Sequence, residues 1–287
     1  MSIETVALPP VALRARRATA EPFAARALLV GLALAFLAVF LALPLAAVFA
    51  QALSKGFGAY ARAVLEPEAL AALRLSLGTA AIAVSLNLVF GLSASWAIAK
   101  FTFRGKNLLL TLIDLPLAVS PVVSGLVFVL VFGRQGWLGP WLSDHGLKVI
   151  FAPPGIVLAT LFVTFPLVVR EVLPVMEACG AEEEEAARLL GASGWQIFFR
   201  VTLPNVKWGV LHGVLLCGAR AMGEFGAVSV VSGHVRGLTN TLPLHIEILY
   251  DEYRFQAAFA VASVLTLFAL ATLLAKTLVA WRSGRKD

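Results

Sequence analysis

The hydrophobic positions of this sequence form six runs that are long enough to cross a membrane. They cover residues 28–50, about 75–99, about 108–132, about 154–175, about 206–231 and about 256–281. A membrane-spanning helix needs about 20 mostly apolar residues to cross roughly 30 Å of hydrocarbon. The pattern therefore predicts an all-α integral membrane protein with six transmembrane helices.

The first run, 28–50, contains no charged residue. A cleaved secretory signal has a core of about 7–15 apolar residues and a small-residue cleavage site. This run is longer, and the residues after it show no obvious stop, so we expect a retained first helix. The basic, low-complexity residues 1–27 before it are expected to form a cytoplasmic tail.

Composition and charge strengthen the membrane assignment. Hydrophobic residues make up 60% of the chain, the mean hydropathy is +0.88, and 14% of residues are charged, whereas soluble domains are about a quarter charged. With six spans, one side of the membrane holds 14 lysines and arginines and the other side holds 7. Basic residues collect on the cytoplasmic side. We therefore predict that both termini are cytoplasmic, and the net charge of +6 gives no reason to invoke nucleic acid.

Residues that usually carry catalysis or bind metals are sparse. The four histidines lack metal-ligand spacing, and Cys179 and Cys217 fall in a predicted loop and a predicted span, so no disulfide framework is expected. The Gly-Lys pair in RGKNLL at 104–109 lacks the other residues of a phosphate-binding loop. We expect no catalytic residue, no metal site and no cofactor in this chain.

The segment 177–204, between the fourth and fifth predicted spans, carries the signals of two short helices. Glu182–Glu185 are four consecutive acids of the kind favoured in the first turn of a helix. Arg188 lies at same-face spacing from the last two of them. Gly191 follows ARLL, where a left-handed helix stop is common. The first short helix is predicted to lie between these signals.

A second start follows at once. Ser193 and Gln196 have the spacing of a capping box, and Pro204 stands where the fifth span begins, a position that tolerates proline. Between them, three aromatic residues share one predicted helix face: Trp195, Phe198 and Phe199.

An ordered loop of this length usually has a function, and charged and aromatic side chains on a rigid frame suit docking. We predict that 177–204 contacts a partner. Two alternatives stay open for the aromatic residues, which either enter that partner or pack on the chain's own spans.

Two charges lie inside the fifth predicted span. Arg220 and Glu224 are four residues apart and therefore on one helix face. Ionisable residues inside a membrane are functional candidates by default. The pair is either a structural ion pair or part of a conduit for an anion.

The rival functions need features that we do not find in the sequence. A stand-alone secondary transporter should show internal repeats and broken helices; Pro116 and Pro121 suit a broken third span, but no matching segment is evident in the second half. A membrane enzyme needs catalytic residues gathered at one depth, and Asp114, Arg220 and Glu224 are too few and too different.

The segment EAARLLGASGWQIFFRVTLP resembles the EAA loop of ABC-importer membrane subunits. The residues that match its pattern are Glu185, Ala186, Ala187, Gly191, Leu203 and Pro204, while Val201 stands in place of an isoleucine. The resemblance implies the type I ABC importer permease fold over about 70–281. It also implies that 177–204 is the coupling loop, which seats on a cytoplasmic ATPase subunit through Glu185, with a bend at Gly191 and contacts from Trp195.

Longer segments are similar to the sulfate/thiosulfate-type permeases, most closely the W-type. They are ARAMGEFGAVSVVSGHVRGLTNTLPLHIEILYDEY at 219–253, LIDLPLAVSPVVSGLV at 112–127 and TFPLVVREVLPVM at 164–176. The shorter GEFGA at 223–227 also occurs in molybdate-type permeases, so another oxyanion such as molybdate or tungstate is the alternative cargo.

The resemblance further implies the assembly in which such a permease works. Its partners would be a T-type sister permease, two ATPase subunits that bind the ATP and magnesium, and an external sulfate-binding protein, in a bacterial inner membrane and in contact with its lipid. This chain itself would carry no catalytic residue.

Overall fold

The computed structural model describes residues 23–283, and all regular structure within that range is helical. Of the predicted tail 1–27, residues 1–22 lie outside the described residues, and 23–27 belong to the first helix. The chain divides into two units, residues up to Ala47 and residues from Val48.

The first membrane-spanning candidate, Phe23–Ala52, contains a π-helical turn. It consists of α1 (Phe23–Leu37), the π turn η1 (Ala38–Ala42) and α2 (Leu43–Ala52). In the turn, the Leu43 N–H donates to the Ala38 carbonyl oxygen, and Pro44 follows directly. Because proline has no N–H to continue the α-helical ladder, the wider turn lets the helix pass it.

Three long helices form the middle of the second unit: α4 (Pro67–Lys100), α8 (Pro153–Ala178) and α11 (Leu203–Met222). The buried Asn87 side chain of α4 joins them. Its amide donates to the Leu161 carbonyl oxygen at 3.2 Å and to Thr164 Oγ1 at 2.8 Å, and it lies 3.6 Å from Cys217 Sγ. A buried amide is costly without such partners, so Asn87 fixes how these helices pack.

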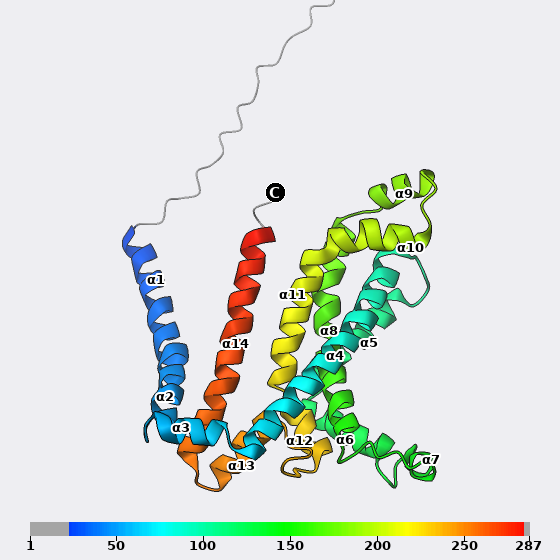
Figure 1. Cartoon of the computed structure of the whole chain (residues 1–287). Helices are drawn as coiled ribbons and strands as arrows, with labels where there is room; N and C mark the ends of the chain where they lie inside the picture. The colour runs from blue at the N-terminus through cyan, green and yellow to red at the C-terminus, as the bar shows by residue number, and fades with distance from the viewer. Residues whose placement is uncertain (1–22, 284–287) are drawn as a thin grey trace, which may run out of the picture. The chain divides into compact units, whose positions relative to one another are not determined.

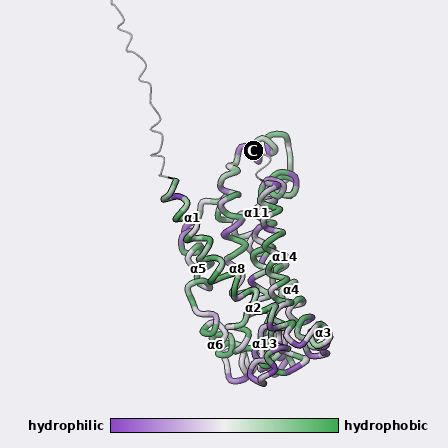
Figure 2. The backbone as a smooth tube through the Cα atoms, turned by 90° about the vertical axis from the view of Figure 1, so that its left-hand side faces the viewer, coloured by the Kyte–Doolittle hydropathy of each residue, from purple (hydrophilic) through white to green (hydrophobic). Residues whose placement is uncertain are grey.

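The remaining long helix and the short helices complete the second unit. They are α3 (Phe57–Val64), α5 (Lys106–Ala118), α6 (Pro121–Phe132), α7 (Gly139–Asp144), α9 (Glu182–Leu189), α10 (Gly194–Ile197), the π turn η2 (Phe198–Thr202), α12 (Gly226–Ser232), α13 (Leu242–Asp251) and α14 (Phe255–Ser283). Figure 1 shows α9 and α10 at the end of the unit where α4, α8 and α14 end, and α3, α7 and α13 at the opposite end. Hydrophobic residues predominate along the long helices (Figure 2).

The structure differs from the predicted third and fifth spans, because each is broken. The range 108–132 falls on α5 and α6, which meet at 107°, and the range 206–231 falls on α11 and α12, which meet at 53°. At the first break Val119 and Ser120 are extended, as expected for the residue before Pro121. The expectation that no second segment matches a broken third span was therefore wrong.

The two half-helices beyond the breaks pack against each other. A Cβ added to Gly125 of α6 would lie 2.8 Å from the Ala227 carbonyl oxygen of α12, and one added to Gly226 would lie 3.0 Å from Pro121 Cβ. Small residues allow this close approach between helices. Gly125 and Gly226 are therefore packing contacts between α6 and α12.

Among the described residues, four helices are long and apolar enough to cross a membrane, and counting each bent pair as one span raises the number to six. The other predicted ranges, 75–99, 154–175 and 256–281, lie inside α4, α8 and α14. The chain is therefore a multi-pass membrane protein.

Candidate functional site

The segment 177–204 folds largely as its local signals indicate. The four acids Glu182–Glu185 open α9. Gly191 follows the helix with φ +84°, a left-handed conformation in which glycine is not strained. Ser193 caps α10: the Gln196 N–H donates to Ser193 Oγ, and the Ser193 N–H donates to Gln196 Oε1.

The second short helix does not end before the fifth span. α10 continues through η2 into α11, so Gly194–Met222 is one continuous helical segment. The Leu203 N–H donates to the Phe198 carbonyl oxygen, and Pro204 follows directly, as at Leu43 and Pro44 in the first span. The π turn carries the helix past a proline that we expected to mark a new start.

Side chains of this segment bond to the end of α4. Glu184 Oε1 lies 3.1 Å from Lys100 Nζ and accepts a hydrogen bond of 2.7 Å from Thr202 Oγ1. Glu183 accepts a hydrogen bond from Asn205, and Lys100 donates to the Gly180 carbonyl oxygen. The middle two acids therefore hold α9 against α4 and α11.

Arg188 was expected to pair with Glu184 or Glu185, and within residues 23–283 it forms no ion pair with either. Glu184 turns instead toward Lys100, which comes from a distant part of the sequence. Glu185 and Arg188 are exposed.

The outer surface of α9 and α10 is apolar as well as charged. Leu189 and Leu190 are 90% and 89% exposed, and Trp195 is 75% exposed. Ala186 is exposed, whereas Ala187 and Leu203 are half-buried. We use the name α9–α10 surface for seven exposed side chains on and beside these two helices: Glu185, Ala186, Arg188, Leu189, Leu190, Trp195 and Phe199.

The aromatic residues divide between the two alternatives. Phe198 is half-buried and packs edge-on against Trp96 of α4, with ring centroids 5.7 Å apart. Trp195 and Phe199 stack on each other at 5.8 Å and stay exposed. One ring therefore anchors the segment, and two remain available to a partner. Leu189 and Leu190 were not singled out from the sequence, although two adjacent leucines beside the helix stop were a usable signal.

The pair Arg220 and Glu224 does not share a helix face as predicted, because α11 ends between them at Met222. Arg220 Nη1 lies 3.1 Å from Glu224 Oε2, across the break. Glu224 is 2% exposed, and its Oε1 accepts a hydrogen bond of 3.1 Å from the Ala227 N–H at the start of α12. Glu224 thus joins the two half-helices, and Arg220 keeps an exposed edge.

Two further ion pairs lie inside the predicted spans. Arg170 Nε of α8 lies 3.0 Å from Asp114 Oδ1 of α5, and both side chains are about half exposed. Lys276 of α14 lies 3.9 Å from Glu171 of α8. These four charges lie in predicted spans, but the sequence does not show which of them pair. The two members of each pair are more than 50 residues apart in the sequence.

Within residues 23–283, no group of three or more histidine, cysteine or acidic side chains could hold a metal ion. Cys179 and Cys217 are both free thiols.

Comparison with known proteins decides the family. Residues 87–284 match the family described as "Binding-protein-dependent transport system inner membrane component". The chain belongs to this family. The breaks, the α9–α10 surface and the intramembrane pairs are therefore features of a permease subunit.

Individual relatives agree with this assignment. The "Sulfate transport system permease protein CysW" of Escherichia coli (strain K12) is 51% identical over 90% of this chain and 89% of its own length. CysW of Synechocystis is 50% identical over 92% of this chain and 96% of its own length. CysT of Escherichia coli (strain K12) is 37% identical over 89% of this chain and 92% of its own length. These relatives confirm the predicted resemblance to the W-type permeases and the prediction of a membrane subunit rather than an enzyme.

A solved structure shares the fold. A bacterial ABC transporter involved in the import of the acidic polysaccharide alginate matches with a TM-score of 0.73, over 92% of this chain and 96% of that chain, at 17% identity. A second structure of a bacterial alginate ABC transporter, in complex with a pentasaccharide-bound periplasmic protein, matches with a TM-score of 0.72. At such low identity the likeness supports the ABC transporter permease fold alone.

Proposed function

We propose that this chain is the membrane-spanning permease subunit of an ATP-driven importer for sulfate or thiosulfate. The observation that carries the proposal is the identity of about half of all residues, over about nine-tenths of the chain, with permeases named for sulfate transport. Identity to the CysT permease is lower, which supports the W-type role beside a T-type sister. Another oxyanion, such as molybdate or tungstate, is the alternative cargo.

The proposed assembly has one copy of this chain, one sister permease, two cytoplasmic ATPase subunits and an external sulfate-binding protein. ATP and magnesium belong to the ATPase subunits, so this chain needs no cofactor of its own. The chain crosses a bacterial inner membrane six times, with α5–α6 and α11–α12 each counted as one span and with both termini in the cytoplasm. The excess of lysine and arginine on the α9–α10 side supports this orientation.

Coupling to the ATPase runs through 177–204. Glu185, Ala186 and Trp195 present their side chains on the α9–α10 surface, and Gly191 provides the bend between the two helices. Ala187, Leu203 and Pro204 belong to the same motif, nearer to the spans. Exposed leucines and a tryptophan beside charged residues form an apolar patch of the kind that marks a contact with a protein partner. Without a partner, about 90% of the surface of Leu189 and Leu190 would be in contact with water.

Mechanical work passes from this surface into the spans through two connections. One is the continuous helix from α10 through η2 to α11. The other is the set of bonds from Glu184 to Lys100 and Thr202. When two ATPase subunits close on ATP, a seated α9–α10 surface moves with them, and α4 and α11 move as a consequence.

The translocation pathway is proposed to pass the exposed edges of two arginines. Half-exposed charges within a span are too costly to face lipid, so they face either a water-filled path or a neighbouring subunit. Arg220 beside Glu224 and Arg170 beside Asp114 meet this condition. Each carboxylate offsets its arginine, which keeps the path mildly attractive to a dianion without trapping it.

The test of the coupling role is a charge reversal on the α9–α10 surface. Glu185→Arg is expected to abolish sulfate uptake in the assembled transporter while the permease stays inserted. Glu182→Arg is the matched control, because Glu182 is exposed on the same helix but lies outside the EAA pattern. Uptake that is equally lost, or equally retained, in both variants would refute a specific contact at Glu185.

The cargo needs a separate measurement. The ATPase rate of the purified complex with its external receptor is compared in sulfate, thiosulfate, molybdate and tungstate. Stimulation by sulfate or thiosulfate alone supports the proposal, and stimulation only by molybdate or tungstate favours the alternative.

A further inference from the structure

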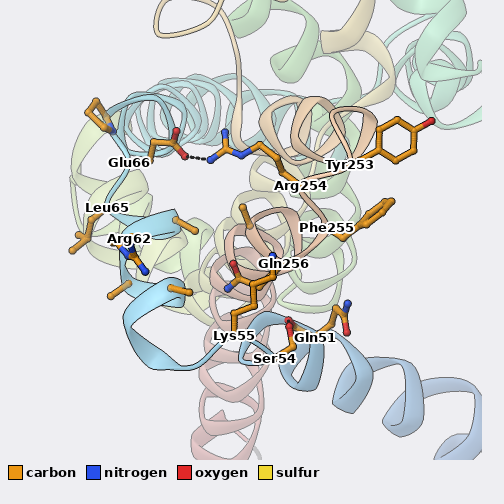
Figure 3. A pocket seen from close by; sticks show the side chains of 15 residues that line it. Gln51, Ser54, Lys55, Arg62, Leu65, Glu66, Tyr253, Arg254, Phe255 and Gln256 are labelled. Atoms are coloured by element: carbon orange, nitrogen blue, oxygen red, sulfur yellow. Dashed lines mark hydrogen bonds and ion pairs between the residues drawn. The ribbon is translucent and has the colours of Figure 1, made fainter.

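An open pocket of about 900 Å³ is lined in part by α3 and by the start of α14. Both elements lie at the end of the second unit opposite α9 and α10 (Figure 1). Its lining comes from two segments far apart in the sequence, 51–67 and 253–257. Figure 3 shows Gln51, Ser54 and Lys55 along one edge, and Glu66 and Arg254 joined by their ion pair along the opposite edge.

The pocket is positively charged. Arg254 Nη2 lies 2.9 Å from Glu66 Oε2, so these two charges offset each other. Lys55 and Arg62 also line the pocket, are both exposed, and form no ion pair with any described residue. Arg62 donates through Nε to the Gly58 carbonyl oxygen at 3.3 Å, which leaves its terminal nitrogens for a ligand. The lining therefore offers two unpaired cations to an anion.

The surroundings of the pocket place it at a membrane surface. It opens just after α2 ends at Ala52 and where α14 begins at Phe255, which are the ends of two candidate spans. The helix α3 lies across the end of α14 (Figure 1) and is tied to it by the contact between Tyr60 Oη and Ser263 Oγ at 3.1 Å. The face of α3 toward α14 is apolar, with Ala63 buried. A short amphipathic helix held in this way is typical of the interface.

Apolar side chains stand exposed beside the two cations. Leu53, Phe57 and Leu65 are exposed, as is Tyr253 at the pocket rim. Aromatic residues with a polar end favour the headgroup level of a bilayer. A ligand that combines a phosphate-bearing head with hydrocarbon chains matches both features, whereas a free oxyanion would use only the cations.

We propose that this pocket binds the phosphate headgroup of an anionic phospholipid, in the leaflet opposite the α9–α10 surface. Lys55 and Arg62 neutralise the phosphate, while Gln51 and Gln256 lie at the lining as hydrogen-bonding side chains. Gln256 already donates to the Ala52 carbonyl oxygen at 2.7 Å, which fixes the start of α14 against the end of α2. A bound lipid would brace this junction. The proposal holds whichever oxyanion the assembly carries.

The test measures lipid bound to the assembled transporter. The complex is purified from nanodiscs that contain phosphatidylglycerol and phosphatidylcholine in equal amounts, and the retained lipids are counted by native mass spectrometry. The double variant Lys55→Gln, Arg62→Gln is expected to lose about tenfold or more in phosphatidylglycerol affinity, since each basic residue near a membrane surface contributes about one kcal/mol. Phosphatidylcholine retention should not change.

A matched control removes two other cations that flank α7 in the sequence, at the same end of the second unit (Figure 1). Arg134 and Lys148 are exposed and form no ion pair within residues 23–283, and they line a different pocket. Arg134→Gln, Lys148→Gln should leave phosphatidylglycerol retention unchanged. Equal loss in both double variants would show unspecific attraction to basic charge and overturn the proposal.

Two further arms separate the lipid from other ligands. Sulfate or inorganic phosphate added at millimolar concentration should not displace phosphatidylglycerol, and displacement would identify a free-anion site instead. If the Lys55, Arg62 double variant keeps its phosphatidylglycerol but binds the external receptor more weakly, the pocket is a protein-docking surface and the lipid proposal fails. Equal thermal stability of all variants in lipid-free detergent excludes misfolding as the cause.

Discussion

Lys100 Nζ lies 3.1 Å from Glu184 Oε1, and this ion pair joins the last residue of α4 to the first turn of α9. Both side chains are mostly buried, at 12% and 17% exposed. Glu184 also accepts the Thr202 hydroxyl hydrogen bond, so one carboxylate holds three parts of the chain together.

Replacing Lys100 should therefore loosen coupling without preventing membrane insertion. Lys100→Gln leaves Glu184 partly buried with one hydrogen bond, a local cost of about 1–2 kcal/mol. We expect sulfate uptake to fall several-fold while ATP hydrolysis continues, which is measured as the ratio of the two rates. Lys106→Gln is the control, because its contact with Glu177 is 3.8 Å long and more exposed. An unchanged ratio in Lys100→Gln would show that the pair transmits nothing.

The bend between α9 and α10 can be tested by comparing Gly191 with Gly194, because the two positions differ in backbone conformation but not in the space around them. A Cβ would meet no atom within 4 Å at either position, but φ is +84° at Gly191, whereas Gly194 is the first residue of α10. Gly191→Ala should cost about 1–2 kcal/mol in the left-handed conformation and reduce binding to the ATPase subunits. Gly194→Ala should be neutral or slightly stabilising. Binding affinities that fall equally in both variants would contradict a role for the bend.

Arg220→Ala should destabilise the break between α11 and α12, because Glu224 would stay buried without its cation. Removing one partner of a wholly buried pair costs about 3–5 kcal/mol; solvent reaches Arg220, so we expect about 2 kcal/mol. The melting temperature of the purified complex measures this loss. Adding Glu224→Gln should recover part of it, since an amide is cheaper to bury than a lone carboxylate. No recovery in the double variant would argue against the pair as the cause.

The contact between α6 and α12 predicts intolerance to a single methyl group. Gly125→Ala would place Cβ 2.8 Å from the Ala227 carbonyl oxygen and 2.9 Å from Val230 Cβ, and overpacking of this kind costs about 1–3 kcal/mol. Gly78→Ala in α4 meets nothing within 4 Å and should be tolerated. The yield of folded, monodisperse complex distinguishes the two, and equal yields would show that α6 and α12 can move apart freely.

His245 in α13, outside the candidate spans, predicts a pH dependence of stability. Burial lowers the pKa of its imidazole, against the opposing effect of the nearby Glu68. The unfolded chain, with a histidine pKa near 6.5, then binds more protons than the folded chain, so stability falls as pH drops through about 6.5 toward the lower folded pKa. His245→Gln should flatten this part of a melting-temperature profile between pH 7.5 and 5. An identical slope in the variant would assign the dependence to other groups.

The predictable part of the candidate site is the part set by local signals. Three features depend only on residues within about four positions of each other: the first turn of α9, the left-handed Gly191 and the Ser193–Gln196 capping box. Their geometry therefore follows from the sequence with little help from the rest of the fold. The EAA pattern, with Glu185 exposed, belongs to the same local stretch.

Pairings across the sequence were not predictable in the same way. Glu184 had a nearby candidate in Arg188 but bonds to Lys100, because packing brings the end of α4 closer than the next helical turn. Arg220 and Glu224 have same-face spacing, yet the break at Gly223 turns their contact into a bridge between two helices.

Apolar run length and helix capping act over one or a few turns. The amino-acid pattern alone therefore predicts that the chain is helical, where most spans lie, which family it belongs to and where the two short helices of 177–204 begin. Packing across the sequence sets where the spans break, which acids face inward, which aromatic ring anchors the segment and which cations remain unpaired at the opposite end. These depend on contacts such as Asn87 with Thr164 or Gly125 with Ala227, and such contacts form between residues that the local pattern cannot relate.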